Sequence, residues 1–533
     1  MKRNKFLLLT ILPAMVWISC KKSDFAKVNT NPATLTKVDP GNQFLQAANH
    51  YANDFEYYYD VYRSMMPWMQ YSTNGAGNAP NFNLETGNFN YRYGNFYNNI
   101  GVPLADIPQL IAKMSPADQA SRVYEKAIAS IYMAYSAFYV SDINGSIVYT
   151  QGFKARYGGT LTPTYDPQAT LLDTLDLQVK TAVATLESSQ PNQILYGANY
   201  DPFYGDNAAG EVTEWIKAGN ALRLQMAFRL MKRDPTKVHA IATEVLADAH
   251  QMSSIADSWV LYAGPAFADG SGNFSPTGFL AARPMVDFMV AKQDPRLSIF
   301  YLPNGKGQWI GSPTDPDTSA LPVYKALYAQ SDTPFATLQY RIFTPNYNDG
   351  PGAGNGIAFF PVITYAEYCF IRAEFAARGI TTDNVGQWYT NGVTASIQFY
   401  DARAAAAKVT NYTPVTAGAI ATYLAMPGIA FDNTKALDQI GSQAHLDLFR
   451  EPSEAWAWWK MTGYPTTTST FPWSPLTNNG TVLPLARRAS LNPFPESDAN
   501  YANQKAAYAA MAADPNFGSG PSDPFGRIWW DMP

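Results

Sequence analysis

The sequence predicts a mainly α-helical protein: a degenerate array of tetratricopeptide-type helix pairs that carries long, aromatic-rich loops. Apolar residues recur with helical spacing through most of the chain, and several of the helical segments follow one another as pairs. The segments between them are rich in Gly, Pro, Asn and aromatic residues. No strict repeat consensus is visible, so we describe the array as degenerate.

The first residues have the layout of a secretory signal. Lys2, Arg3 and Lys5 precede an apolar run that ends at Ser19, and Cys20 follows directly. The run is shorter than the roughly 20 apolar residues that a membrane-spanning helix needs. We therefore expect a signal peptide over residues 1–19, a polar tether over residues 20–45 and a single helical domain over residues 46–533.

Helical periodicity is plainest in VYEKAIASIYMAYSAFYV, residues 123–140. Its apolar residues follow the i, i+3, i+4, i+7 spacing of a buried helix face. Similar patterns predict helices at 170–188, 211–232, 236–250, 364–379, 385–406, 434–449, 451–461 and 500–512. An earlier segment, YGNFYNNIGVPLADIPQLI, contains Pro103 and Pro108, which we expect to interrupt a repeat helix.

Four long loops separate the predicted helices, at residues 72–93, 262–284, 301–318 and 340–361. Loops of this length within a compact domain are usually functional or disordered. Aromatic residues make up 14% of the chain, and many of them lie in these loops. The sequence therefore predicts a helical scaffold that presents ordered, decorated loops.

Charge and cysteine content exclude several classes of function. The formal net charge is −5, and removing residues 1–19 leaves −8, which argues against nucleic-acid binding. Besides Cys20, only Cys369 is present, in an apolar helical segment where we expect a buried thiol. Two cysteines so placed support neither a zinc site nor a disulfide framework.

We predict no catalytic residue, no metal site and no cofactor. The four histidines show no ligand spacing and no nucleophile–base pattern. The segment that begins at Asp315 starts like a calcium loop, but Ala320 and Ala326 stand where the loop needs a glycine and an acid. Glu367 and Glu374 lie seven residues apart along one helix, where ion pairs with nearby arginines are the expected role.

Six blocks of the chain occur in the order known from one protein family. They are Asn31-Pro32; Gly205-Asp206 with Trp215, Asn220 and Leu222-Arg223-Leu224; Asp294-Pro295-Arg296-Leu297; TYAEYCFIRAEFAARG; EPSEAWAWWKMTGYP; and FGRIWWDMP. Together they resemble the SusD/RagB-type surface lipoproteins of Gram-negative bacteria, over nearly the whole mature chain. Ile18-Ser19-Cys20 also resembles a lipobox, which marks a cysteine for lipidation.

The resemblance implies a fold, a place and a role. Such proteins look like helical lids, anchored in the outer membrane by lipid on a residue that matches Cys20 and exposed at the cell surface. They capture a nutrient, usually an oligosaccharide, and deliver it to a partner, a SusC-like TonB-dependent transporter. They bind rather than catalyse, so we expect no enzyme activity.

Three alternatives stay open at this stage. The same fold could capture peptides or other nutrients. A secreted glycoside hydrolase is disfavoured because no suitable pair of acids is recognisable. A scaffold that binds only other proteins would leave the aromatic loops without a role.

Sugar binding has a chemistry that the loop residues could supply. A pyranose has an apolar face that lies well on an aromatic ring and a hydroxyl rim that needs polar partners. The candidate ligand-binding residues are Trp309, Tyr347, Phe274, Tyr91, Tyr93, Trp68, Tyr71, Asn273 and Asn346. Trp309 is the leading candidate, because glycines and polar residues surround it and no apolar periodicity draws it into a core. The tryptophans of AWAWWK and IWWD are expected to be structural.

Overall fold

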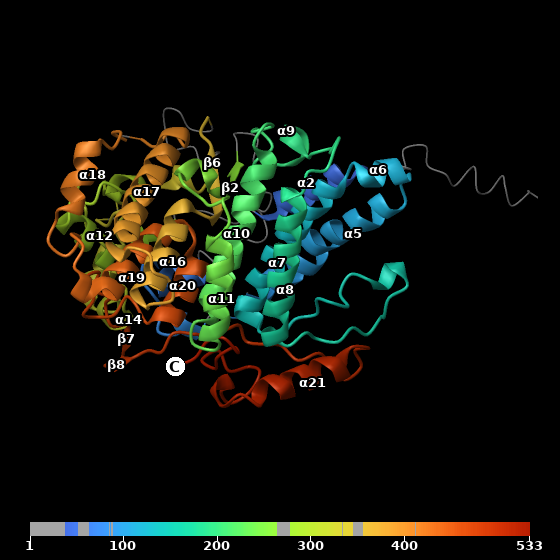
Figure 1. Cartoon of the computed structure of the whole chain (residues 1–533). Helices are drawn as coiled ribbons and strands as arrows, with labels where there is room; N and C mark the ends of the chain where they lie inside the picture. Colours follow the sequence, from blue (N-terminus) through green and yellow to red (C-terminus); the bar gives the residue numbers. More distant parts are fainter. Residues whose placement is uncertain are drawn as a thin grey trace, which may run out of the picture. The chain divides into compact units, whose positions relative to one another are not determined.

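Paired helices form most of the molecule, as the periodicity predicts (Figure 1). The computed structural model describes residues 38–51, 63–84, 86, 89–263, 278–332, 334–344, 355–410 and 412–533. Within it, α7 packs against α8, α8 and α11 both pack against α10, α16 pairs with α17, and α19 packs against α16, α17 and α20. Their bounds are α7 Val123–Asn144, α8 Gln168–Glu187, α10 Glu211–Leu230, α11 Pro235–Leu246, α16 Tyr365–Ala377, α17 Val385–Ala406, α19 Ala436–Asp447 and α20 Pro452–Thr462.

Shorter helices connect these pairs or lie at their margins. They are α2 Pro40–His50, α3 Met66–Trp68, α4 Asn90–Asn95, α5 Gly101–Ala112, α6 Pro116–Ala120, α9 Gly197–Tyr200, α12 Arg283–Ala291, α13 Leu297–Phe300, α14 Pro316–Ser319, α15 Pro322–Tyr328, α18 Ala417–Leu424 and α21 Tyr501–Ala512. Residues 40–533 form one unit, and α2 begins within the range that we expected to be a tether. No helix in the described part of the chain is long and apolar enough to cross a membrane.

Side-chain caps explain where several helices begin. Asp234 accepts a hydrogen bond from the Lys237 N–H at the start of α11, and Thr364 and Asn384 cap α16 and α17 in the same way. The predicted helix over 236–250 ends earlier, at Leu246. There the Gln251 side chain donates to the Val245 carbonyl at 2.7 Å and turns the chain away.

The two early prolines do not interrupt their helix, which corrects our expectation. Both lie inside α5, and the irregularity falls just before it, in a π-helical turn at Phe96–Ile100. Pro103 lies in the first turn of α5, directly after the π-helical turn, which the Gly101 N–H closes by donating to the Phe96 carbonyl. Pro108 removes a single backbone hydrogen bond, and the packing of α5 against α2 and α7 keeps the helix continuous.

Strands are few and short. A four-stranded antiparallel sheet has the order β1-β3-β5-β4, with Thr73 opposite Leu280 and Leu302 opposite Thr337. β2 and β6 form a second antiparallel pair, with Leu261 opposite Phe360, and β7 and β8 form a third. The bounds are β1 Ser72–Asn74, β2 Trp259–Ala263, β3 Phe279–Ala281, β4 Tyr301–Leu302, β5 Thr337–Leu338, β6 Ala358–Ile363, β7 Thr477–Asn478 and β8 Thr481–Val482.

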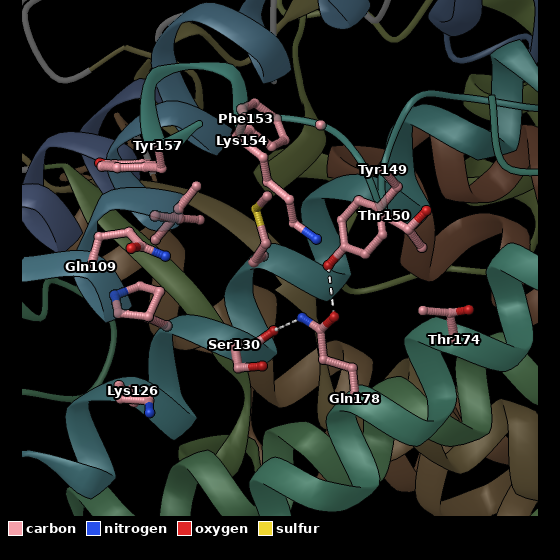
Figure 2. Close-up of a pocket in the computed structure, with 16 residues that line it drawn as sticks. Gln109, Lys126, Ser130, Tyr149, Thr150, Phe153, Lys154, Tyr157, Thr174 and Gln178 are labelled. Carbon is pink, nitrogen blue, oxygen red and sulfur yellow. Dashed lines mark hydrogen bonds between the residues drawn. The ribbon is translucent and has the colours of Figure 1, made fainter. Parts of the chain in front are cut away.

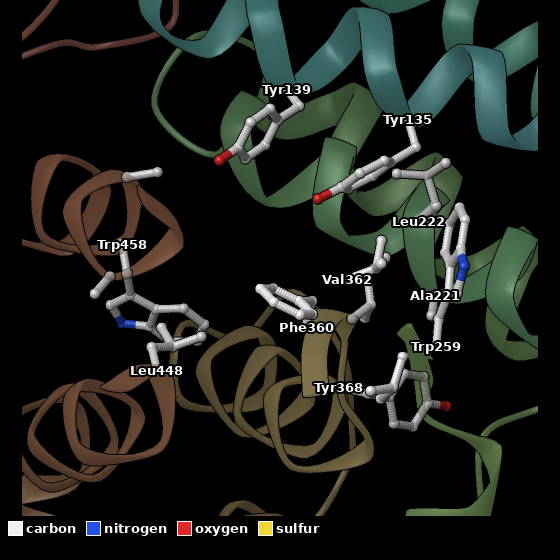
Figure 3. Packing of buried hydrophobic residues seen from close by; sticks show 14 of the residues in the cluster. Tyr135, Tyr139, Ala221, Leu222, Trp259, Phe360, Val362, Tyr368, Leu448 and Trp458 are labelled. Carbon is white, nitrogen blue, oxygen red and sulfur yellow. The ribbon is translucent and has the colours of Figure 1, made fainter. Parts of the chain in front are cut away.

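Aromatic rings fill much of the core. Side chains from α7, α10, α20 and the β2–β6 pair converge there (Figure 3). Trp215 lies 5.0 Å from Trp259 between ring centroids, and Trp458 lies 4.5 Å from Phe228. Cys369 is buried, and burial raises the pKa of its thiol well above the usual value, as expected for an inert core residue.

Candidate ligand-binding surface

The loop that carries Trp309 is held in one shape by a buried asparagine. The side-chain oxygen of Asn304 accepts a hydrogen bond from the Gln308 N–H at 2.9 Å, and its amide donates to the Pro334 carbonyl at 2.8 Å. Gly307 closes the turn with a φ of +73°, which a residue without Cβ adopts at little cost. The backbone that leads into Trp309 is therefore fixed from both sides.

Trp309 is half-buried at the edge of the core. One part of its ring packs against buried residues, and within the described part of the chain its indole N–H has no hydrogen-bond acceptor. Its neighbours Gln308 and Ile310 are both exposed. The Trp309 ring, on this fixed backbone, thus lies beside the Gln308 side chain, whose oxygen accepts from the Asn304 amide at 3.3 Å and whose NH2 group can donate to a ligand.

A short helix, α15, lies next to this loop. The Ile310 carbonyl accepts from the Ala336 N–H at 2.8 Å, and the preceding Phe335 ring lies 6.4 Å from Tyr324 and 5.2 Å from Tyr328 between centroids. None of the residues of α15 is buried. The loop and the helix therefore adjoin through Phe335 and Ala336, just before β5, and present apolar side chains to solvent.

A cation completes the surface. The Arg283 guanidinium donates a hydrogen bond to the Tyr324 hydroxyl at 2.6 Å and lies 5.3 Å from the centre of that ring. Leu321, which precedes α15, and Val323, within it, are 48% and 59% exposed, so they add two apolar side chains to this surface. The Trp309 surface, as we use the term, consists of Arg283, Gln308, Trp309, Ile310, Leu321, Val323 and Tyr324.

Sequence reasoning identified Trp309 and missed the rest of this surface. In LPVYKALY, residues 321–328, every residue except Lys325 is apolar or aromatic, and this lack of a polar face was the signal that could have drawn attention to it. Arg283 carried no comparable signal, because its place beside α15 depends on residues about 40 positions away in the chain.

Trp68 and Tyr71 belong to the core, which corrects their place among the candidates. Trp68 is fully buried, donates its indole N–H to the Phe82 carbonyl at 3.0 Å and packs on Phe89. Tyr71 is fully buried and stacks on His445 at 4.6 Å. Neither ring has exposed surface to offer a ligand, because segments distant in sequence cover both.

Tyr91 and Tyr93 lie on α4. Tyr91 is 44% exposed, whereas Tyr93 is partly buried and its ring centroid lies 4.6 Å from that of Tyr97. Tyr97 in turn stacks on Phe153 at 5.4 Å. Tyr93 is therefore part of an aromatic cluster that extends toward Phe153.

The remaining candidate ligand-binding residues belong to two of the long loops. Asn273, Phe274, Asn346 and Tyr347 lie outside the described residues, and so does Cys20.

The two helical acids that we considered have structural roles. Glu374 forms the expected ion pair with Arg378 at 2.7 Å. Glu367 instead accepts a hydrogen bond from the Gln225 amide at 2.7 Å, and burial raises the pKa of its carboxyl. Both acids are buried, so solvent and substrate do not reach them in this structure.

The segment that resembled a calcium loop also has another role. Asp315 caps α14 by accepting from the Thr318 N–H at 2.8 Å. Asp317 accepts from the backbone N–H groups of Asn479 and Gly480, at 2.7 and 2.9 Å. These carboxylates join α14 to the β7–β8 turn.

Comparison with known proteins adds a family and a fold. A SusD-like family model, described as starch-binding and associating with the outer membrane, matches residues 32–488. No curated protein matches the chain.

Several solved structures are similar. One is a chitin-binding protein with 18% sequence identity and a TM-score of 0.73, and the match covers 93% of this chain and 100% of that one. A chitin-binding SusD homologue from Flavobacterium johnsoniae has 19% sequence identity and a TM-score of 0.67, and the match covers 92% of this chain and 98% of that one. A SusD homologue from Bacteroides fragilis has 19% sequence identity and a TM-score of 0.67, and the match covers 92% of this chain and 100% of that one. At these identities the likeness shows a shared fold.

Proposed function

Because this chain belongs to the SusD-like family of starch-binding proteins that associate with the outer membrane, we propose that it captures an oligosaccharide at the cell surface. It then delivers the oligosaccharide to a SusC-like TonB-dependent transporter, and it binds its cargo without acting as an enzyme. Lipid on Cys20 anchors it to the outer membrane. Two similar structures are described as chitin-binding, which supports a carbohydrate as the class of cargo.

The observation that carries the proposal is the half-buried, rigidly held ring of Trp309 with its uncommitted N–H. A sugar ring that lies on this indole buries its C–H face. Gln308 and Arg283 lie in the same surface and supply donors for the hydroxyl rim. A rigid platform loses little conformational entropy on binding.

Affinity electrophoresis and calorimetry with a panel of starch, chitin and other neutral glycans test this role. We expect Trp309→Ala to weaken binding of the preferred glycan at least about tenfold, equivalent to about 1.4 kcal/mol. Trp309→Phe should keep most of the affinity because it retains an aromatic face. Tyr501→Ala, on the outlying helix α21, is the matched control and should bind as wild type.

Three results would contradict the proposal. Equal affinity of wild type and Trp309→Ala for every glycan that binds would remove the platform from the site. Release of reducing sugar by the purified protein would show catalysis. Retention of peptides but of no glycan by the same panel would favour peptide capture on this fold.

A further inference from the structure

A hollow lies far along the chain from Trp309, between α5, α7, α8 and the loop at residues 149–157 (Figure 2). Its volume of about 490 Å³ falls within the range of small-molecule sites. Sixteen residues line it, and none of them is acidic. Two are lysines, Lys126 and Lys154.

The loop that forms one wall is tied down before it reaches the hollow. The Asp166 carboxylate accepts from the backbone N–H groups of Tyr149 and Thr150, at 2.8 and 2.9 Å. The Tyr97 hydroxyl donates to the Val148 carbonyl at 2.7 Å. The wall is therefore formed without a ligand.

The next part of the loop contains Phe153, whose own backbone conformation costs conformational free energy. Its φ is +61°, in the left-handed region that bulky side chains rarely adopt. The ring fits against Gly101 of α5, where any Cβ would collide with it, and stacks on Tyr97. This packing fixes the direction in which the following residue, Lys154, leaves the backbone.

The two lysines have no anionic partner within the described part of the chain. Lys154 points into the hollow toward Tyr149, and Lys126 lies at its edge (Figure 2). Asp106, on the neighbouring α5, is already engaged by Arg156 at 2.6 Å and by the Tyr157 hydroxyl. In a chain of net charge −5, a hollow with two cations and no acid is a local excess of positive charge.

The other lining residues favour a ligand with both an apolar face and hydroxyl groups. Met133, Phe153 and Pro108 supply the apolar part, and Ser130 carries a hydroxyl. The hydroxyls of Thr150 and Thr174 already donate to Asp166 and to the Thr170 carbonyl, so their oxygens serve a ligand as acceptors. Gln178 is not available, because it donates to the Ser130 carbonyl and accepts from the Tyr149 hydroxyl, each at 2.8 Å. A sugar ring that bears a carboxylate has an apolar face, hydroxyl groups and the negative charge that the two lysines favour.

We propose that this hollow binds a carboxylated sugar, such as a uronic acid unit of an oligosaccharide, with the carboxylate at Lys154 and Lys126. It is a second site, distinct from the Trp309 surface, and it gives an otherwise acidic protein a place for anionic saccharides. An adjoining groove along α7 and α8 shares Lys126, Ser130, Thr174 and Gln178 with the hollow, so a chain longer than one unit fits.

The test uses the mature protein carrying Trp309→Ala, so that the two sites are measured separately. Calorimetry is run with oligomers of galacturonate, glucuronate, mannuronate and guluronate, and with a neutral oligomer matched to each. At least one uronate should bind at least tenfold more tightly than its neutral counterpart, and its affinity should fall as NaCl rises. Lys154→Gln should weaken uronate binding at least tenfold, and Lys126→Gln should weaken it by a smaller factor.

Controls separate this site from folding and from the Trp309 surface. Lys435→Gln changes an exposed lysine elsewhere and should leave uronate binding unchanged. In the protein with Trp309 intact, Lys154→Gln should bind neutral glycans as wild type, so that failure of one site does not imply failure of the other. Bound uronate should also protect Lys154 from acetylation, measured by mass spectrometry.

The proposal is overturned if no uronate in the panel binds, if each uronate binds no better than its neutral match, or if Lys154→Gln binds as tightly as its parent. Binding of an acidic peptide at Lys154 in place of every uronate would also overturn it and would assign the hollow to peptides.

Discussion

Arg296 shows how a single residue explains one of the sequence blocks. Arg296 and Asp294 are both fully buried, with 2.7 Å between Nη2 and the carboxylate. Asp294 also accepts from the Arg296 backbone N–H at 2.9 Å, and Arg296 donates to the Ser396 hydroxyl of α17 at 2.8 Å. The block Asp294-Pro295-Arg296-Leu297 is thus a tightly closed turn that joins two distant segments.

We expect Arg296→Met to destabilise the protein by about 3–5 kcal/mol, because it leaves the Asp294 charge buried without its partner. Thermal and urea unfolding measure the change. Lys180→Met, which breaks the exposed pair with Glu244, is the control and should cost within about 1 kcal/mol. Equal effects of the two substitutions would show that the buried pair is not holding this turn.

Lys460, on α20, is a buried amine between two tryptophans. Its Nζ lies 3.6 Å from the centre of the Trp456 ring and 4.6 Å from that of Trp530. Burial lowers the pKa of the ammonium from 10.5 to about 7, although Asp531 and Asp142 act in the opposite direction. In the folded protein, the Lys460 amine is therefore mostly neutral at alkaline pH.

This lowered pKa makes stability depend on pH with a definite sign. Between pH 7 and 10.5 the unfolded chain binds more protons at Lys460 than the folded one, so its contribution to stability rises with pH, by up to about 1.4 kcal/mol per unit. Below pH 7 Lys460 is charged in both states, so the full free-energy cost of burying its ammonium destabilises the folded protein. We expect Lys460→Met to stabilise the protein most near pH 7 and progressively less toward pH 10. A difference in Tm from wild type that stays constant across this range would contradict the assignment.

Among the helices, Gly219 determines how closely α10 approaches α8. A Cβ at this position would lie 2.5 Å from the Val183 Cγ2 atom, and Val183 has little rotamer freedom on a helix. We expect Gly219→Ala to destabilise the protein by about 1–3 kcal/mol, because overpacking exceeds the gain in helix propensity.

Gly94 of α4 is the matched control for Gly219. Beyond the backbone of its own helix, no atom in the described part of the chain would lie within 4 Å of a Cβ at this position. Gly94→Ala should therefore stabilise the protein by up to about 1 kcal/mol. Differential scanning calorimetry of both variants measures the two shifts. Shifts of the same sign would mean that propensity, and not contact between α8 and α10, governs both positions.

Helices with a strong internal period were predicted well. The predicted range 385–406 coincides with α17, and the ranges for α8, α10, α16 and α20 differ from the structure by at most two residues at either end. α5 and α15 depended on contacts outside their own sequence. Neighbouring helices hold Pro108 within α5, and packing on Phe335 places α15.

At the scale of the whole molecule, the proposed lipid anchor depends on Cys20. We expect wild-type protein to fractionate with the outer membrane and to incorporate labelled palmitate, and Cys20→Ala to do neither. A single acyl chain binds a membrane only marginally, so multiple acylation is part of this prediction. Cys369→Ala changes the buried cysteine and should remain in the membrane. Membrane retention of Cys20→Ala would contradict the anchor.

The sequence by itself determined the helical class and the order of the family blocks, and it singled out Trp309 as the leading candidate for ligand binding. Each of these is local: periodicity, short motifs and polar surroundings can be read within a few residues. The tertiary structure decided which aromatic residues are exposed. Trp68 is buried because Phe89 and Trp456 cover it, and Trp456 is 388 positions away in the chain. Lys154 became a candidate only because the loop at residues 149–157 brings it to a hollow lined by α5, α7 and α8, and such an arrangement depends on contacts that no local pattern records.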